Sequence, residues 1–216
     1  MKFGLQTYAL IDEIELGLVS SYALEKTFGE NVLFGAYSSV DIKGTILGLE
    51  VAFSKKPQSS YIGTQKIFSK EGFKPQFVIN FNRRITEKSF LLVEYCFNDL
   101  GYTETEFLQI INLLENNYVD YIYDITKLLQ PGYVSKNYFF TTFSYEIFDD
   151  ISININFLSE KTFSSGFVYT QVMFTRISNL TISIEYIKNY ITNNIKNEFY
   201  LLPYDQQKQF RIKLYF

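Results

Sequence analysis

Three observations predict an all-β fold, an antiparallel transmembrane β-barrel with about 11–12 strands in this chain. Apolar and polar residues alternate without a fault over 151–157, 181–186 and 209–216. The alternating segments are about nine to twelve residues long, which is enough to cross a bilayer at a tilt. The connections between these segments are short and long by turns.

The predicted strands follow one another along the whole chain. Each has one apolar and one polar face, because successive side chains of a strand point to opposite sides of the sheet. Noisier alternation marks the other strands, at 2–10, 14–25, 31–41, 45–54, 76–84, 89–98, 136–147 and 167–177. Alternation also fits a sandwich or a lipocalin-like soluble barrel, but soluble strands more often have about five or six residues. Strand length therefore favours the membrane barrel.

The predicted connections alternate in size from one end of the chain to the other. The short ones are 12–13, 42–44, 85–88, 149–150 and 178–179. The long ones are 26–30, 55–75, 99–135, 159–166 and 189–208. Short periplasmic turns and longer outer loops are typical of a transmembrane barrel, whereas a sandwich gives no reason for such regularity.

The composition excludes several classes of protein. The chain has 216 residues, a net charge of -3, 47% hydrophobic residues, one Cys and no His. Its apolar content is too high for disorder, and one Cys cannot form a disulfide scaffold. The balanced charge gives no reason to expect a nucleic-acid partner. No apolar run reaches the length of roughly 18 residues that marks a transmembrane helix.

The sequence also predicts that the protein is not an enzyme and that it uses no metal or cofactor. Without His, the histidine-dependent mechanisms and His-ligated metals are excluded, and no phosphate-binding glycine loop occurs. The acidic pairs at 12–13 and 149–150 lie in expected tight turns, where Asp favours the turn itself. Cys96 should face inward, and a lone Cys is more often packed than nucleophilic.

The longest connection, 99–135, predicts a helical hairpin. Thr103 and Glu106 form a capping box at a helix start. Apolar residues follow at helical spacing: Phe107, Ile110, Ile111 and Leu114. A second helical stretch is expected at 119–129, before Pro131. The hairpin either covers a pore as a lid or plug, or only covers the barrel rim.

The two faces of the barrel have different expected surroundings, because lipid cannot solvate charge whereas a water-filled lumen can. The side chains expected to face lipid are Leu16, Leu18, Leu49, Val51, Phe53, Ile79, Phe81, Leu91, Val93, Ile153, Ile155, Ile182, Ile184, Ile212 and Leu214. The candidates that line the lumen are Glu15, Glu50, Glu94, Glu146, Glu185, Arg211 and Lys213. Glu185 shares its face with Arg211 and Lys213, which predicts a cross-strand ion pair.

Aromatic residues at strand ends have two explanations. They fit the girdles that lie at the two membrane interfaces. They also fit an AT-rich genome, whose codons favour Phe and Tyr. The residues concerned are Tyr22, Phe34, Phe97, Tyr145, Tyr186 and Phe216.

The last strand carries a resemblance to a known family. Phe210, Ile212, Leu214 and Phe216 lie on one face, and the chain stops on an aromatic residue. This resembles the C-terminal signature of bacterial outer-membrane β-barrel proteins, and 89–216 is similar to the C-terminal part of porin-like proteins. The resemblance implies a Gram-negative outer membrane, contact with its lipid, and recognition of these four residues by the barrel-assembly machinery.

Strand parity leads to an expectation about completeness. Single-chain bacterial barrels have an even number of strands and periplasmic termini. Counted back from an inward-running last strand, the strand at 2–10 also runs inward. We therefore expect 1–216 to be one barrel domain that lacks a signal peptide and at least one N-terminal strand. The alternative is a further strand at 61–68, which would break the alternation of connections.

Two functions follow from this interpretation. The first is porin-like passage of small solutes or ions, with selectivity set by the charged residues of the lumen. The second is a structural or surface-binding barrel whose lumen is closed, since interior space grows with strand number. The sequence names no substrate for the first function and no partner for the second.

Overall fold

The structure is a computed structural model that describes residues 2–25, 29–55, 58–62, 65–70, 72–112, 115–116, 135–160, 165–175, 180–191 and 206–214. Its strands are β1 Lys2–Ile11, β2 Ile14–Glu25, β3 Gly29–Ile42, β4 Thr45–Lys55, β5 Gln58–Ile62, β6 Gln65–Lys70, β7 Lys74–Thr86, β8 Ser89–Asn98, β9 Asn137–Phe148, β10 Ile151–Glu160, β11 Ser165–Phe174, β12 Leu180–Ile191 and β13 Gln206–Leu214. Every strand predicted from the alternation is present.

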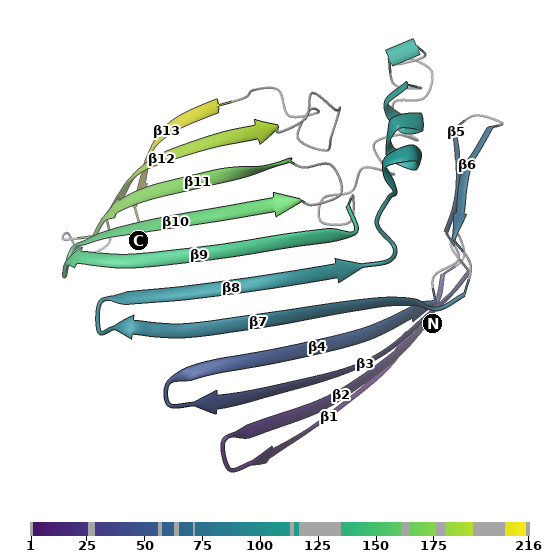
Figure 1. Cartoon of the computed structure of the whole chain (residues 1–216), viewed down its shortest axis with the longest axis horizontal. Helices are drawn as coiled ribbons and strands as arrows, with labels where there is room; N and C mark the ends of the chain where they lie inside the picture. Colours follow the sequence, from purple (N-terminus) through teal and green to yellow (C-terminus); the bar gives the residue numbers. More distant parts are fainter. Residues whose placement is uncertain are drawn as a thin grey trace. The chain divides into compact units, whose positions relative to one another are not determined.

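One sheet contains eleven of these strands, in the order β1-β2-β3-β4-β7-β8-β9-β10-β11-β12-β13 (Figure 1). Apart from the gap between β4 and β7, the order follows the chain, as hairpin connections require. β5 and β6 pair with each other in a separate two-stranded sheet. The alternative of one further strand at 61–68 in the main sheet is therefore wrong, because β4 is followed directly by β7. The single-domain expectation stays a prediction.

The strict alternation of connection lengths is corrected by the structure. β10 ends at Glu160 and β11 begins at Ser165, so this connection is shorter than the predicted 159–166. The β11–β12 connection, expected to be short, runs from 175 to 179. At the end of β10, backbone pairing continues past the residues where the side-chain pattern breaks off, because ladder hydrogen bonds do not depend on side-chain polarity. β11 instead ends at Phe174, before the predicted end at 177.

The chain divides into two compact units. The first unit consists of Met1–Val40, Gly48–Ile79 and Cys96–Asn137. The second unit consists of Asp41–Leu47, Asn80–Tyr95 and Tyr138–Phe216. Each candidate site lies within one of them.

The tight turns use residues that accept positive φ. Lys43 and Gly44 have φ of 52° and 77°, as a two-residue type I′ hairpin turn requires. The Gly44 N–H donates to Asp41 Oδ1 at 2.8 Å, which fixes the turn. Asp12, in the β1–β2 turn, has φ of 54°. Asp is one of the residue types that tolerate this conformation.

The predicted first helix of the 99–135 loop is present over 104–112. Its capping box is confirmed, because the Thr103 N–H donates to Glu106 Oε2 at 2.8 Å and the Glu106 N–H donates to Thr103 Oγ1 at 3.3 Å. The second helical stretch, 119–129, and Leu114 lie outside the described residues. Among the described helices, none is long and apolar enough to cross a membrane.

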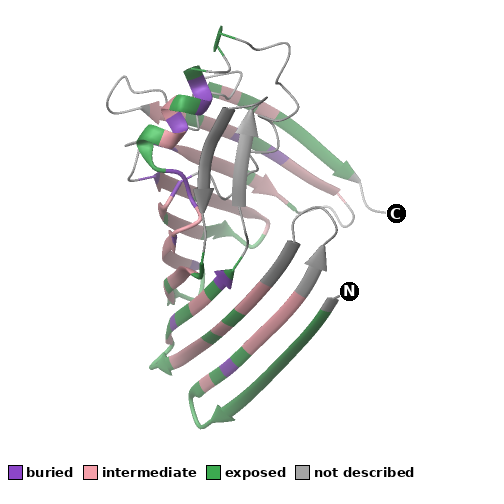
Figure 2. Ribbon diagram, turned by 90° about the vertical axis from the view of Figure 1, so that its right-hand side faces the viewer, coloured by how far each residue is buried: buried purple, intermediate pink, exposed green. Residues whose placement is uncertain are grey.

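Among the residues whose side chains the structure describes, the buried apolar ones lie in this loop and not in the sheet. Within the described residues, the buried hydrophobic side chains are Tyr102, Phe107, Ile110 and Ile111 (Figure 2 shows the buried stretches of the helix). Large apolar side chains of the strands are instead exposed, as at Ile184, which is 61% exposed. A sandwich would cover such a face with a second sheet. An uncovered apolar face needs apolar surroundings, which lipid provides.

Two tyrosine rings lie over glycines of the neighbouring strand. Gly17 is the direct register partner of Tyr37, and Gly166 is the partner of Tyr190. A Cβ at either glycine would overlap the facing ring, and at Gly166 it would also overlap the Leu158 carbonyl oxygen. These glycines therefore provide the space in which the rings pack.

We expect Gly166→Ala to destabilise the protein by about 1–3 kcal/mol, the usual cost of overpacking. The Tyr190 ring could turn away from the new methyl group, but the Leu158 backbone oxygen cannot. Gly4→Ala is the matched control, because a Cβ there finds Ser20 O at 3.7 Å, an ordinary contact. Chemical denaturation measures both free energies of unfolding, and equal costs would contradict the steric explanation.

Candidate functional site

A row of polar side chains crosses five strands of the second unit. Ser144, Asn154, Gln171, Glu185 and Gln209 are successive register partners on β9 to β13. Directly opposed residues of antiparallel strands point to the same face of a sheet. The five side chains therefore form one polar row.

Glu185 is the centre of this row. It is 4% exposed, and its Oε1 accepts hydrogen bonds from Gln171 Nε2 at 3.2 Å and Ser183 Oγ at 3.1 Å. Arg211 Nη2 lies 3.3 Å from Glu185 Oε2 and also donates to Gln209 Oε1 at 3.1 Å. The predicted cross-strand ion pair is confirmed for Arg211. It is diagonal, because the direct partner of Arg211 is Ser183.

Uncharged side chains continue the polar face on β9 and β10. Ser144 Oγ donates to Asn154 Oδ1 at 2.6 Å, and Thr142 Oγ1 donates to Asn156 Oδ1 at 2.7 Å. Asn156 is also the register partner of Tyr169 on β11. These pairs hold each other in fixed orientations, because each hydroxyl–amide bond orients both groups.

The opposite face of the same strands is apolar. Its central row is Tyr145, Ile153, Val172, Ile184 and Phe210, again successive register partners. Phe210 is 66% exposed, so nothing within the described chain covers it. The residues predicted to face lipid and those predicted to face the lumen thus lie on opposite faces of these strands.

In the first unit, two of the predicted lumen candidates lie near Tyr37. Tyr37 donates to Glu15 Oε1 at 3.1 Å. A hollow of about 170 Å³ is bordered by Tyr37, Gly35, Glu50 and Gln76. The predicted candidates Glu15 and Glu50 thus lie near the same tyrosine.

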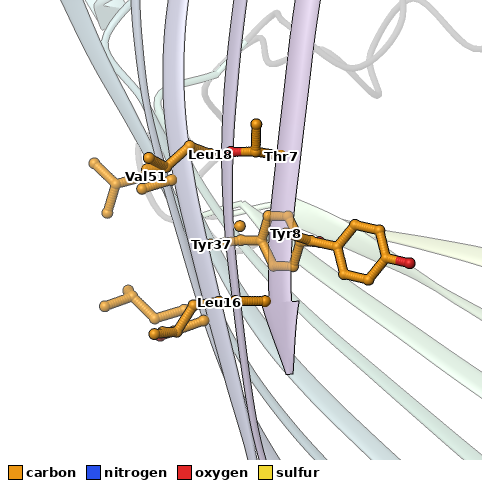
Figure 3. Close-up of a pocket in the computed structure, with 11 residues that line it drawn as sticks. Thr7, Tyr8, Leu16, Leu18, Tyr37 and Val51 are labelled. Atoms are coloured by element: carbon orange, nitrogen blue, oxygen red, sulfur yellow. The ribbon is translucent and has the colours of Figure 1, made fainter. Parts of the chain in front are cut away.

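A larger hollow of about 470 Å³ lies in the first unit among apolar side chains. In Figure 3, Leu16, Leu18 and Val51 extend to one side of the strands and Tyr8 to the other. Leu16, Leu18 and Val51 all belong to the set predicted to face lipid. The hollow is therefore a feature of the apolar face.

An ion cluster joins the two ends of the 99–135 loop to β7, and we call it the loop neck (Lys74, 98–102 and 135–137). Asp99 Oδ1 lies 2.8 Å from Lys136 Nζ, and Asp99 Oδ2 lies 3.6 Å from Lys74 Nζ. The Asn98 N–H donates to the Lys136 carbonyl at 2.8 Å. The neck holds the start and the end of the loop together.

Electrostatics strengthen the neck. Burial raises the pKa of the Asp99 carboxyl, but the hydrogen bond from Lys136 and the charges of Lys136 and Lys74 outweigh it and lower the pKa below its ordinary value. Burial, with a smaller contribution from Glu106, raises the pKa of the Tyr102 phenol. Asp99 is therefore ionised, and Tyr102 neutral, at neutral pH.

The lowered pKa of Asp99 predicts a stable neck at neutral pH and its loss only in strong acid. A lowered folded-state pKa stabilises above the ordinary value, about 3.9, and the stabilisation disappears as pH falls through the folded-state pKa. We expect the NMR methyl signals of Ile110 and Ile111 to stay constant from pH 7 to about 4 and to shift below it. Asp99→Asn should abolish the step, and a step centred above the ordinary value would contradict this assignment.

The other predicted site residues are more scattered. Glu146 is exposed and faces Ser152, and Lys213 is exposed and faces Thr181. Glu94 is half-buried on β8. Phe210 and Ile212 of the C-terminal signature lie exposed on the apolar face, whereas Phe216 lies outside the described residues.

Sequence reasoning missed the uncharged members of the polar face and the loop neck. Charge drew attention to Glu185 and Arg211, while Asn154, Asn156 and Gln171 lie on the same face. The strict alternation of Asn154 and Asn156 with isoleucines was a signal that could have found these two residues. Nothing local indicated Asp99, because its partners are far away in the sequence.

A sheet of long antiparallel strands with one apolar exposed face and one polar face is typical of the outer-membrane β-barrel fold. No protein-family model and no curated protein matches the chain. Among solved structures, it is similar to OmpT (in-vitro folded), an outer membrane protein of Vibrio cholerae, with 12% identity and a TM-score of 0.52. That match covers 99% of this chain and 64% of the other.

A loop L8 deletion mutant of OmpT is also similar, with 12% identity, a TM-score of 0.50, and coverage of 89% of this chain and 58% of the other. The chain thus spans about three fifths of these structures. At this identity the likeness shows the fold, which is that of an outer-membrane β-barrel protein. It agrees with the predicted localisation in the bacterial outer membrane.

The prediction that the protein is not an enzyme does not stand and is corrected. The finding that overturns it is the likeness in fold to the OmpT structures. This fold does not exclude catalysis, because a fold can host catalysis as readily as transport and the chemistry belongs to the site. The absence of His excludes histidine-dependent mechanisms and no others.

Proposed function

We propose that the protein provides porin-like passage for small solutes across the outer membrane, along the polar face of its sheet. The observation that supports this most is the polar row from Ser144 to Gln209, which crosses five neighbouring strands without an apolar interruption. The apolar row one residue away faces the other side. Such a division suits lipid on one side and water on the other.

Charge within the polar face also supports passage. Glu185 is neutralised by Arg211, while Glu146 and Lys213 are exposed on the same face. An exposed charge prefers a hydrated surrounding to a sealed interior. These residues would set the selectivity for ions.

Conductance in a planar lipid bilayer tests this function. We expect discrete single-channel current steps from the purified protein. Lys213→Glu should shift the reversal potential in a KCl gradient towards cations, because it replaces a cation of the polar face by an anion. Incorporated protein that yields no steps would overturn the proposal.

A second candidate function is surface binding by a barrel with a closed lumen. It is favoured by the structure in the long connections, since β5 and β6 form their own hairpin and the loop neck holds a capped helix.

In either case we propose contact with outer-membrane lipid and recognition of Phe210, Ile212, Leu214 and Phe216 by the barrel-assembly machinery. Deletion of Phe216 should slow assembly into the membrane.

A further inference from the structure

We propose that the polar face of β9–β11 binds uncharged, hydroxyl-rich solutes of the sugar class. This inference rests on the proposed function and names its substrate. The site, here called the amide patch, consists of Thr142, Ser144, Asn154, Asn156, Tyr169 and Gln171. Its side chains belong to three neighbouring strands of the second unit.

The register makes the amide patch contiguous. Thr142, Asn156 and Tyr169 form one row of direct partners, and Ser144, Asn154 and Gln171 form the next row. Rows two residues apart lie about 7 Å from each other, and three strands span roughly 10 Å. All six side chains are half-buried, so each keeps a surface to offer to a ligand.

The hydrogen-bonding groups of the patch match those of a sugar. Ser144 and Thr142 direct their hydrogens to the Oδ1 atoms of Asn154 and Asn156, at 2.6 and 2.7 Å. An amide nitrogen carries two donor hydrogens, and a hydroxyl oxygen has two lone pairs. The patch therefore presents donors beside acceptors, and a sugar hydroxyl is both. Because the pairs orient each other, a ligand has little side-chain entropy to overcome.

Tyr169 adds an apolar surface to these polar groups. An aromatic ring offers a flat apolar body with a polar tip. Tyr169 lies beside Asn156 in the register. A sugar ring likewise combines an apolar C–H face with polar edges, so both parts of it find a complementary group here.

The neighbouring charges favour an uncharged ligand over an ion. The patch itself contains no charged residue. Of the carboxylates that border it, Glu185 is 4% exposed and paired with Arg211 at 3.3 Å, whereas Glu146, two residues from Ser144 on the same face, is exposed and repels anions. An ion would exchange its hydration shell for neutral dipoles only, which is unfavourable. A neutral polyol exchanges water hydrogen bonds for equivalent ones.

Current block by maltotriose in a planar bilayer tests the inference. We expect maltotriose to reduce the ion current in a saturable manner, and sodium glutamate at equal concentration to leave it unchanged. Asn154→Leu combined with Asn156→Leu should weaken the maltotriose affinity by about tenfold or more, the effect of losing two hydrogen-bonding groups. Gln207→Leu on β13, outside the patch, is the control and should retain the block.

Other outcomes separate the two proposals. Calorimetric titration of maltotriose into detergent-solubilised protein reads binding without conductance, so binding without current steps would overturn the proposed passage alone. Current steps that maltotriose does not block, together with no heat of maltotriose binding in the titration, would overturn the sugar site. Equal block of the current by glutamate would also overturn it. If the double variant does not fold, Tyr169→Leu provides the same comparison and should also weaken the affinity.

Discussion

Arg211→Met should lower the free energy of unfolding by on the order of 3 kcal/mol, because it leaves the Glu185 carboxylate in a buried position without its cation. Glu185 is 4% exposed, whereas the Arg211 side chain is 45% exposed. The two partners are therefore unequal. Removing the exposed Arg211 leaves the buried Glu185 carboxylate without a cation. Removing Glu185 leaves an arginine that water can solvate.

The controls follow from this asymmetry. Lys213→Met changes the same charge on the same face of β13 and should cost no more than about 0.5 kcal/mol. Glu185→Gln should cost less than Arg211→Met, and the double variant should cost less than the sum of the two. Urea unfolding from lipid vesicles measures all four proteins. Equal losses for Arg211→Met and Lys213→Met would contradict the assigned role of the pair.

Ile184→Arg should destabilise the protein in a bilayer by about 2–4 kcal/mol, if the residue lies near the membrane midplane. Ile184 is 61% exposed in the centre of the apolar row between Val172 and Phe210. A guanidinium there must leave water for lipid. In water the same substitution on an exposed strand would be nearly neutral.

Gln207→Arg is the matched control for Ile184→Arg. Gln207 lies two residues from Gln209 on the polar face of β13 and takes no part in the Glu185–Arg211 pair, so the new cation would enter the polar face and not the apolar one. We expect this variant to unfold from vesicles with nearly unchanged free energy. If both arginines cost the same, the apolar face would not be the lipid face.

The strands and turns were predictable because their causes are local. Period-2 alternation placed β10 and β12 within a few residues of their observed bounds. The capping box at Thr103 and Glu106 was confirmed for the same reason, since both partners lie within one helical turn. The lengths of the connections were predicted less well, because strand pairing extends past the predicted end of β10 and stops before the predicted end of β11.

The sequence by itself determined which side chains share a face of one strand, and so separated Glu185 from Ile184. Only the tertiary structure decided which of them meet across strands. The register puts Arg211 diagonal to Glu185, Tyr190 over Gly166, and Asp99 between Lys74 and Lys136. A shift of one residue in the register between two strands would preserve the alternation within each strand. It would move every side chain of the shifted strand to the other face of the sheet. Non-local pairing therefore creates the polar face, although local pattern supplies its residues.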